Sequence, residues 1–198
     1  MEPRLISRRE GIILTSIQII HEAGFQGLST REVAKREGIS ESAIFKHFKS
    51  KGELILAILN HFSQYDQAVF TAVKARKVHE VEAIQDFVET FVTYYENYPP
   101  ITAILNTYDN LFSDKEFNEK VKSIFFARLN FLQELVDRGV EAGLISGEIS
   151  SEALADTIDG IIRLMSLKWR MNNFSFSLRE ETMKTVNSIL KGFTFLNH

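Results

Sequence analysis

The chain has no cysteine among its 198 residues. This absence excludes disulfide bonds, thiolate metal sites and cysteine nucleophiles together. Proline and glycine are scarce, at three and ten residues, and no Asn-Gly pair occurs. Because no sustained alternation of apolar and polar residues appears either, β-hairpins have little support. We therefore expect an all-α protein.

Long apolar runs are also missing. The longest stretches free of Lys, Arg, Asp and Glu, Leu54–Tyr65 and Asn97–Tyr108, span twelve residues each, whereas a membrane helix needs about 20 apolar residues. Near the N-terminus, Gln18, His21 and Glu22 interrupt the apolar residues, which is unlike a secretory signal. We expect a cytoplasmic protein with no membrane-spanning segment.

Catalytic and metal-binding motifs are absent from the sequence. The histidines show neither His-x-x-x-His nor His-Glu-x-x-His spacing, and no Gly-rich phosphate loop occurs. We therefore expect no enzyme activity, no metal site and no cofactor.

The net charge of −3 hides an asymmetry along the chain. Up to Lys51 there are nine Lys and Arg against six Glu, and from Gly52 onward there are fourteen against twenty acidic residues. Aromatic residues have the opposite bias, because thirteen of the sixteen Phe, all five Tyr and the single Trp follow Lys51. A basic segment is a common footprint of phosphate binding. We expect a head over residues 1–51 and a larger helical body over residues 52–198.

Serine–glutamate pairs at capping-box spacing predict five helix starts. The serines of these pairs are Ser7, Ser29, Ser50, Ser113 and Ser177. Glycines and the Pro99-Pro100 pair mark where helices end. The sequence predicts about nine helices, near residues 7–23, 29–37, 41–48, 51–76, 80–97, 101–112, 114–142, 151–171 and 178–195.

The helices predicted at 29–37 and 41–48 are joined by Gly38, Ile39 and Ser40. Gly38 can adopt the left-handed conformation and Ser40 can cap the second helix, which is the chemistry of a helix-turn-helix corner. The glycine spacing alone fits an ordinary helical corner equally well.

Further residues decide between these readings. The region resembles the DNA-binding head of the TetR family of transcriptional regulators, whose pattern runs roughly as Thr, Ile-Ala, Gly-Val-Ser, Leu-Tyr, His-Phe, Lys and Leu. The matching residues here are Thr30, Val33-Ala34, Gly38-Ile39-Ser40, Ile44-Phe45, His47-Phe48, Lys51 and Leu54. Two departures occur: Phe45 replaces the usual Tyr and lacks its hydroxyl, and Thr15-Ser16 replace two alanines of the first helix.

The predicted DNA contacts follow from helix termini and side-chain chemistry together with this resemblance. Thr30 and Arg31 lie at a helix start that attracts a phosphate, His47 and Lys51 are expected to hold phosphates, and Lys46 can donate to guanine. Glu41 has two open roles, acceptance from cytosine or stabilisation of its helix. The full predicted set is Ser29, Thr30, Arg31, Glu41, Ser42, Ala43, Phe45, Lys46, His47 and Lys51.

The aromatic body is either a solid core or the lining of a pocket for an apolar or aromatic small molecule. The resemblance implies the pocket, and its predicted residues are Phe62, Phe91, Tyr95, Tyr108, Phe125, Arg128, Leu129, Met165 and Trp169. It also implies a homodimer built from the last two long helices. The predicted interface residues are Ile158, Ile161, Ile162, Val186, Ile189, Leu190 and Phe193.

These observations lead to two hypotheses. The first is a homodimeric, ligand-responsive regulator, a repressor, that binds a palindromic operator in double-stranded DNA and is released by its effector. In it, the helix at 51–76 transmits ligand binding from the body to the head. The second is a helical ligand-binding or scaffolding protein whose head no longer binds DNA.

Overall fold

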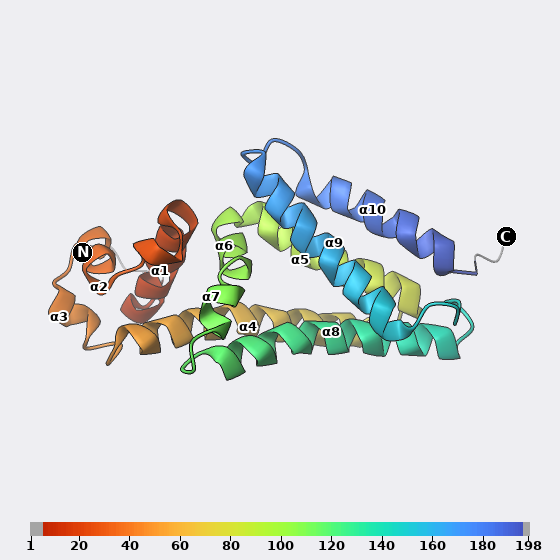
Figure 1. The fold of residues 1–198 in the computed structure, drawn as a ribbon, viewed down its shortest axis with the longest axis horizontal. Coiled ribbons are helices and arrows are strands. Elements are labelled where there is room, and N and C mark those ends of the chain that lie inside the picture. The colour runs from red at the N-terminus through yellow and green to blue at the C-terminus, as the bar shows by residue number, and fades with distance from the viewer. Residues whose placement is uncertain (1–5, 196–198) are drawn as a thin grey trace. The chain divides into compact units, whose positions relative to one another are not determined.

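A computed structural model describes residues 6–195, and these residues are almost entirely helical (Figure 1). The helices are α1 (Arg8–Ala23), α2 (Thr30–Glu37), α3 (Glu41–Ile44), α4 (Lys51–Ala75), α5 (Glu80–Asn97), α6 (Thr102–Leu105), α7 (Tyr108–Phe112), α8 (Asn118–Glu141), α9 (Ser151–Met171) and α10 (Leu178–Phe193). Short 3₁₀ turns occupy Phe25–Gly27 and Pro99–Ile101. The expected all-α fold is confirmed.

The described part of the chain divides into two compact units. The head unit comprises the residues up to Gln64 together with Pro99–Lys122, and the body unit comprises Tyr65–Tyr98 and the residues from Ser123 onward. Helices α4 and α8 contribute residues to both units. This structural division does not follow the boundary expected after residue 51, and where the DNA-binding function ends along the chain stays a prediction.

Four of the five predicted helix starts have the expected serine cap. The hydroxyl oxygens of Ser7, Ser29, Ser50 and Ser177 accept hydrogen bonds from the backbone amides three residues later. Ser113 is the exception, because it follows the end of α7 and its hydroxyl donates to the Asp109 carbonyl. Helix α8 therefore begins at Asn118 rather than near residue 114.

The single helix expected at 101–112 is two short helices, α6 and α7. Between them, the amides of Asn106 and Thr107 bond carbonyls three residues back, and the Thr107 hydroxyl donates to the Ile104 carbonyl at 2.8 Å. A Thr side chain that bonds the backbone in this way competes with the helical pattern. This break accounts for ten helices in residues 6–195 instead of nine.

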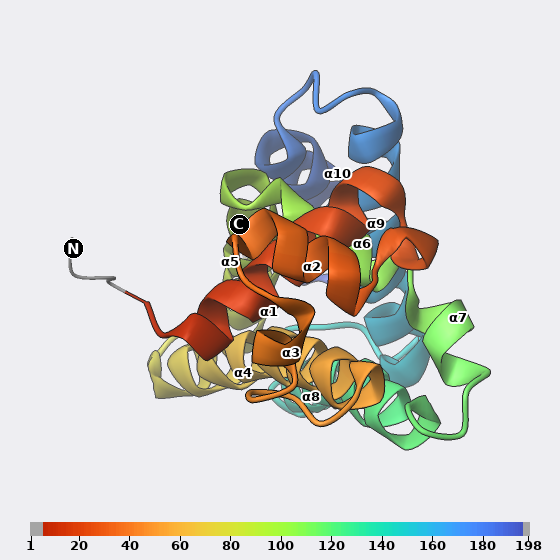
Figure 2. The ribbon, with the colours of Figure 1, turned by 90° about the vertical axis from the view of Figure 1, so that its left-hand side faces the viewer.

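Each unit has its own core. In the head unit, α2 packs on α1 and α3 packs on α2 (Figure 2), with Ile12, Ile17, Val33, Ile44 and Leu54 fully buried. In the body unit, α10 runs alongside α5 and α9 (Figure 1), and the rings of Phe70, Phe87 and Phe131 stack. No helix in residues 6–195 is long and apolar enough to span a membrane.

Candidate nucleic-acid interface

The corner between α2 and α3 has helix-turn-helix geometry. Gly38 adopts the left-handed conformation, with φ 65° and ψ 34°, where an L side chain is strained. The amides of Gly38 and Ile39 bond the Lys35 and Ala34 carbonyls and close α2. Ser40 accepts from the Ala43 amide and opens α3. The predicted turn is therefore confirmed in its local detail.

Cations on the side of the corner predicted to face DNA are exposed and carry unneutralised charge. Arg31, Lys46 and Lys51 are exposed, and none has a carboxylate within ion-pair distance among residues 6–195. The Lys51 ammonium lies 5.8 Å from the centroid of the Phe25 ring, at the first residue of α4. An approaching phosphate therefore finds positive charge without first breaking an ion pair.

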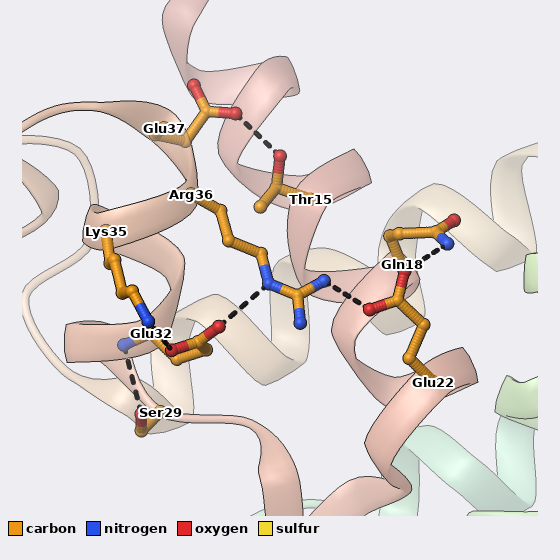
Figure 3. A network of polar contacts seen from close by, with 8 residues as sticks. All are labelled: Thr15, Gln18, Glu22, Ser29, Glu32, Lys35, Arg36 and Glu37. Atoms are coloured by element: carbon orange, nitrogen blue, oxygen red, sulfur yellow. Dashed lines mark hydrogen bonds and ion pairs between the residues drawn. The ribbon is translucent and has the colours of Figure 1, made fainter.

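Elsewhere on α2, the basic residues are already neutralised, as Figure 3 shows. The Arg36 guanidinium donates to Glu32 at 2.9 Å and to Glu22 of α1 at 2.6 Å, and Lys35 pairs with Glu32. Hydrogen bonds from Gln18 and Arg36 lower the pKa of Glu22, and that from Arg36 lowers the pKa of Glu32. This network fixes α2 against α1.

The side-chain hydroxyls of Thr15 and Ser16 in α1, which replace the usual alanines, both make hydrogen bonds. The Thr15 hydroxyl donates to Glu37 at 2.6 Å (Figure 3), and the Ser16 hydroxyl donates to the Ile12 carbonyl at 2.7 Å. Glu37 also lies 3.6 Å from Arg8. The Thr15 hydroxyl, where the TetR pattern has alanine, thus adds a hydrogen bond between α1 and α2.

Two predicted DNA contacts bond each other. The Thr30 hydroxyl donates to the Glu41 carboxylate, which joins the first residues of α2 and α3. Glu41 therefore has a partner within the head, as expected if it stabilises its helix. For Thr30 to donate to a phosphate, its hydroxyl must leave this carboxylate.

The other predicted contacts on or near α3 differ in exposure. Phe45 is 46% exposed. Ser42 is exposed with its hydroxyl 2.9 Å from that of Ser40, whereas Ala43 and His47 are half-buried. Ser29 is exposed, and its hydroxyl oxygen caps α2 by accepting from the Glu32 amide.

A buried ion pair lies in the body unit, where the sequence predicted a ligand pocket. Arg128 of α8 donates through Nε and Nη2 to both oxygens of Asp66 of α4, at 2.8 and 2.6 Å, and through Nη1 to the Tyr95 hydroxyl at 2.6 Å. Its guanidinium carbon lies 4.2 Å from the centroid of the Phe91 ring. These residues are at most 2% exposed. The structure thus brings together three of the nine predicted pocket residues.

Burial controls the protonation of this cluster. It raises the pKa of Asp66 against the opposing attraction of Arg128, and raises the pKa of Tyr95 to about 12. Because Asp66 already accepts two hydrogen bonds from Arg128, we assign the cluster a structural role.

The remaining predicted pocket residues are dispersed. Phe125 and Leu129 line a groove of about 500 Å³ in the body unit. Met165 and Trp169 are buried on α9, and the Trp169 indole donates to the Phe176 carbonyl at 2.8 Å. Phe62 and Tyr108 belong to the head unit, where their rings meet edge to face.

The predicted dimer residues are largely covered within one protomer. Ile158, Ile162, Val186 and Leu190 are at most 2% exposed, whereas Ile161, Ile189 and Phe193 are half-buried. Helix α9 has a second apolar face that the prediction missed, formed by Leu164, Leu167 and Met171, which are 65%, 36% and 75% exposed.

Two buried acids also escaped the sequence analysis, Asp66 and Asp159. Each follows an apolar residue of its own helix by four positions, Phe62 and Ala155, and so lies on a buried face. That placement is a signal the sequence does carry, because an acid on an apolar stripe needs a partner. No group of three or more His, Asp and Glu able to hold a metal occurs in residues 6–195.

Comparison with known proteins identifies the family. Residues 12–58 match the profile described as bacterial regulatory proteins of the TetR family, and residues 71–192 match that of the YsiA-like protein C-terminal region. The chain belongs to the TetR family. As a member of the TetR family it is a DNA-binding transcriptional regulator, in agreement with the helix-turn-helix corner.

Individual relatives of this TetR-family chain are distant. The nucleoid occlusion factor SlmA of Haemophilus influenzae is 25% identical over 173 residues, covering 84% of this chain and 79% of SlmA. The ketosteroid transcriptional regulator KstR2 of Mycobacterium tuberculosis has a TM-score of 0.83 at 16% identity, covering 97% of both chains. FadR of Bacillus subtilis, solved with stearoyl-CoA, has a TM-score of 0.79 at 19% identity, covering 92% of this chain and 98% of FadR. These solved structures show that the fold is shared.

Proposed function

We propose that this regulator is a homodimeric repressor that binds a palindromic operator and is released from it by an apolar or aromatic small molecule. The observation that carries the proposal is the distribution of ion pairs in the head unit. Arg36 and Lys35 are neutralised by Glu32 and Glu22, whereas the exposed Arg31, Lys46 and Lys51 have no carboxylate partner in residues 6–195.

This distribution disfavours the alternative of a head that no longer binds DNA. Phosphate contacts by Lys and Arg supply most of the sequence-independent affinity for DNA. Lys46 lies two residues after the end of α3, the proposed recognition helix, and Lys51 is the first residue of α4. The missing hydroxyl at Phe45 removes one phosphate contact and leaves these cations in place.

The exposed apolar face of α9 supports the dimer. Leu164, Leu167 and Met171 recur at helical spacing and are 65%, 36% and 75% exposed. A row of exposed apolar side chains at this spacing favours packing against another helix. A second copy, related by two-fold symmetry, would cover this row and present two recognition helices to one operator. We therefore place the proposed interface on these residues together with the half-buried Ile161 and Ile189.

The groove in the body unit supports an effector of apolar character. Phe125, Phe126 and Leu129 line it, and Phe126 is 52% exposed. The FadR neighbour was solved with stearoyl-CoA, so this fold accommodates a molecule with a long apolar part. Helix α4 contributes to both units and is a continuous route by which effector binding would alter the head.

A ligand screen followed by operator titration tests this proposal. Apolar and aromatic compounds are first ranked by the increase in melting temperature they cause, and hits are then added to the protein–operator complex. We expect a hit to weaken operator binding about 5- to 150-fold, the usual range of allosteric coupling. A hit that stabilises the protein but leaves operator affinity unchanged would contradict the effector part of the proposal.

Two phenylalanines of nearly equal exposure provide a matched control. Phe126 lines the groove and is 52% exposed, whereas Phe112 of α7 in the head unit is 48% exposed and is not among the groove residues. Phe126→Ala should weaken ligand binding while Phe112→Ala does not. Equal losses from both variants would place the ligand outside the groove.

A further inference from the structure

The groove of the body unit has two chemically different walls. Helix α8 contributes apolar and aromatic side chains, chiefly Phe125, Phe126 and Leu129, and helix α9 contributes the acids Glu152, Asp156 and Asp159. Of the eleven lining residues three are acidic, and the one basic residue is Arg163. The excess of acidic over basic residues gives the groove a negative formal charge, which favours organic cations.

Asp159 is the residue that points to a ligand. It is 3% exposed, and its Oδ1 is buried with no hydrogen-bond partner among residues 6–195. The other oxygen, Oδ2, accepts from Nε of Arg163. A buried carboxylate oxygen without a donor is unfavourable, and Asp159 is one of the residues that line the groove.

Arg163 makes this kind of contact inside the groove. Its guanidinium pairs with Asp159 and lies 4.8 Å from the centroid of the Phe125 ring. A planar, N–H-bearing cation is therefore held between a carboxylate and an aromatic face, where both charge attraction and the ring quadrupole favour it. Next to this pair, Gly160 leaves open space on the groove side, because a Cβ built there would meet nothing within 4 Å.

We propose that the groove binds an organic cation that carries N–H donors and an apolar or aromatic body. The cation donates to Oδ1 of Asp159, within the field of Glu152 and Asp156, and the body packs on Phe125, Phe126 and Leu129. The inference rests on the proposed effector role only for its biological meaning, since binding to the groove is measurable without DNA.

Three molecules of the same shape and different charge test the proposal. They are 2-naphthamidine, 2-naphthamide and 2-naphthoate, titrated calorimetrically into the full-length protein. We expect the amidine to bind most tightly and the carboxylate most weakly, with about a ten- to hundredfold difference between amidine and amide from one charge-assisted hydrogen bond. Naphthoate that binds as well as naphthamidine, or naphthamidine that does not bind, would overturn the proposal.

Variants tie the charge preference to one residue. Asp159→Asn should bring the amidine to within about threefold of the amide and leave the amide unaffected, because the shape is kept and the charge is lost. Asp137→Asn, an exposed acid of α8 outside the groove, should change nothing. If Asp159→Asn does not fold, the exposed Asp156→Asn should weaken amidine binding alone. An unchanged amidine-to-amide ratio in the folded variant contradicts the assignment.

Operator binding separates this inference from the proposed function. If naphthamidine binds through Asp159 but leaves the operator bound, the cation site stands and the effector role fails. If naphthamidine does not bind while another compound releases the operator, the effector role stands and the cation site is wrong.

Discussion

Removal of one member of the buried Asp66–Arg128 pair should destabilise the protein severely. Arg128 makes three hydrogen bonds of 2.6 to 2.8 Å in a site where both residues are 2% exposed. Arg128→Met leaves a buried carboxylate with no counterion, and Asp66→Leu leaves a buried guanidinium. Breaking a buried pair from one side costs about 3–5 kcal/mol. At about 2 kcal/mol per molar urea, this moves the unfolding midpoint by roughly 1.5 to 2.5 M.

The double variant discriminates a structural pair from an incidental one. Arg128→Met combined with Asp66→Leu replaces both charges with apolar side chains and should cost about 1 kcal/mol or less, because no unpaired charge remains. Urea unfolding of the four proteins gives the coupling energy directly.

An exposed pair between the same two helices is the control. Lys74 of α4 lies 2.9 Å from Glu134 of α8, with side chains 48% and 47% exposed. Lys74→Met should cost at most about 1 kcal/mol, as surface pairs do. The structural role of the Asp66–Arg128 pair would be contradicted if Arg128→Met cost no more free energy of unfolding than Lys74→Met, or if the costs of the two single substitutions added up in the double variant.

Three further predictions concern the head, the dimer and pH. Lys51→Ala should weaken binding to every DNA sequence and reduce the slope of log affinity against log salt concentration by about 1. Lys46→Ala should instead relax the preference at one base pair. An equal loss of affinity for all operator variants in Lys46→Ala would exclude a base contact by Lys46. Leu164→Glu should give a folded monomer in sedimentation and lose operator affinity, and a wild-type chain that is a stable monomer would contradict the interface. Burial lowers the pKa of His61 in the folded protein, so protonation favours the unfolded chain. The free energy of unfolding should therefore fall as pH drops below about 6.5, and His61→Gln should reduce this fall. Equal pH profiles for the wild type and His61→Gln would exclude a contribution from His61.

The helix starts could be predicted from sequence because a cap depends on residues three positions apart. Ser7, Ser29, Ser50 and Ser177 act as the spacing predicts. Ser113 has the same spacing, but the Glu116 amide bonds the Asp114 side chain instead. Asp114 lies only two residues before Glu116, but the Ser–Glu spacing alone does not show that its carboxylate will accept from the Glu116 amide.

The interior of the body unit could not be predicted in the same way. Asp66 and Arg128 lie 62 positions apart, so the sequence shows two isolated charges and not a pair. Periodicity also identified an apolar face on α9 through Ile158 and Ile162, but these pack inside the protomer. A pattern of apolar residues does not distinguish a face buried in the chain's own core from one, such as Leu164 and Met171, that is left exposed.

Selection from random double-stranded DNA tests whether the chain binds an operator as a two-fold dimer. The wild-type chain should enrich a palindrome whose half-sites are centred about one helical turn, roughly 34 to 36 Å, apart, because a two-fold dimer presents two identical recognition helices. Lys51→Ala should enrich the same palindrome at lower yield, since phosphate contacts carry no sequence information. Enrichment of no sequence, or of a single half-site with no symmetric partner, would contradict operator binding by a symmetric dimer.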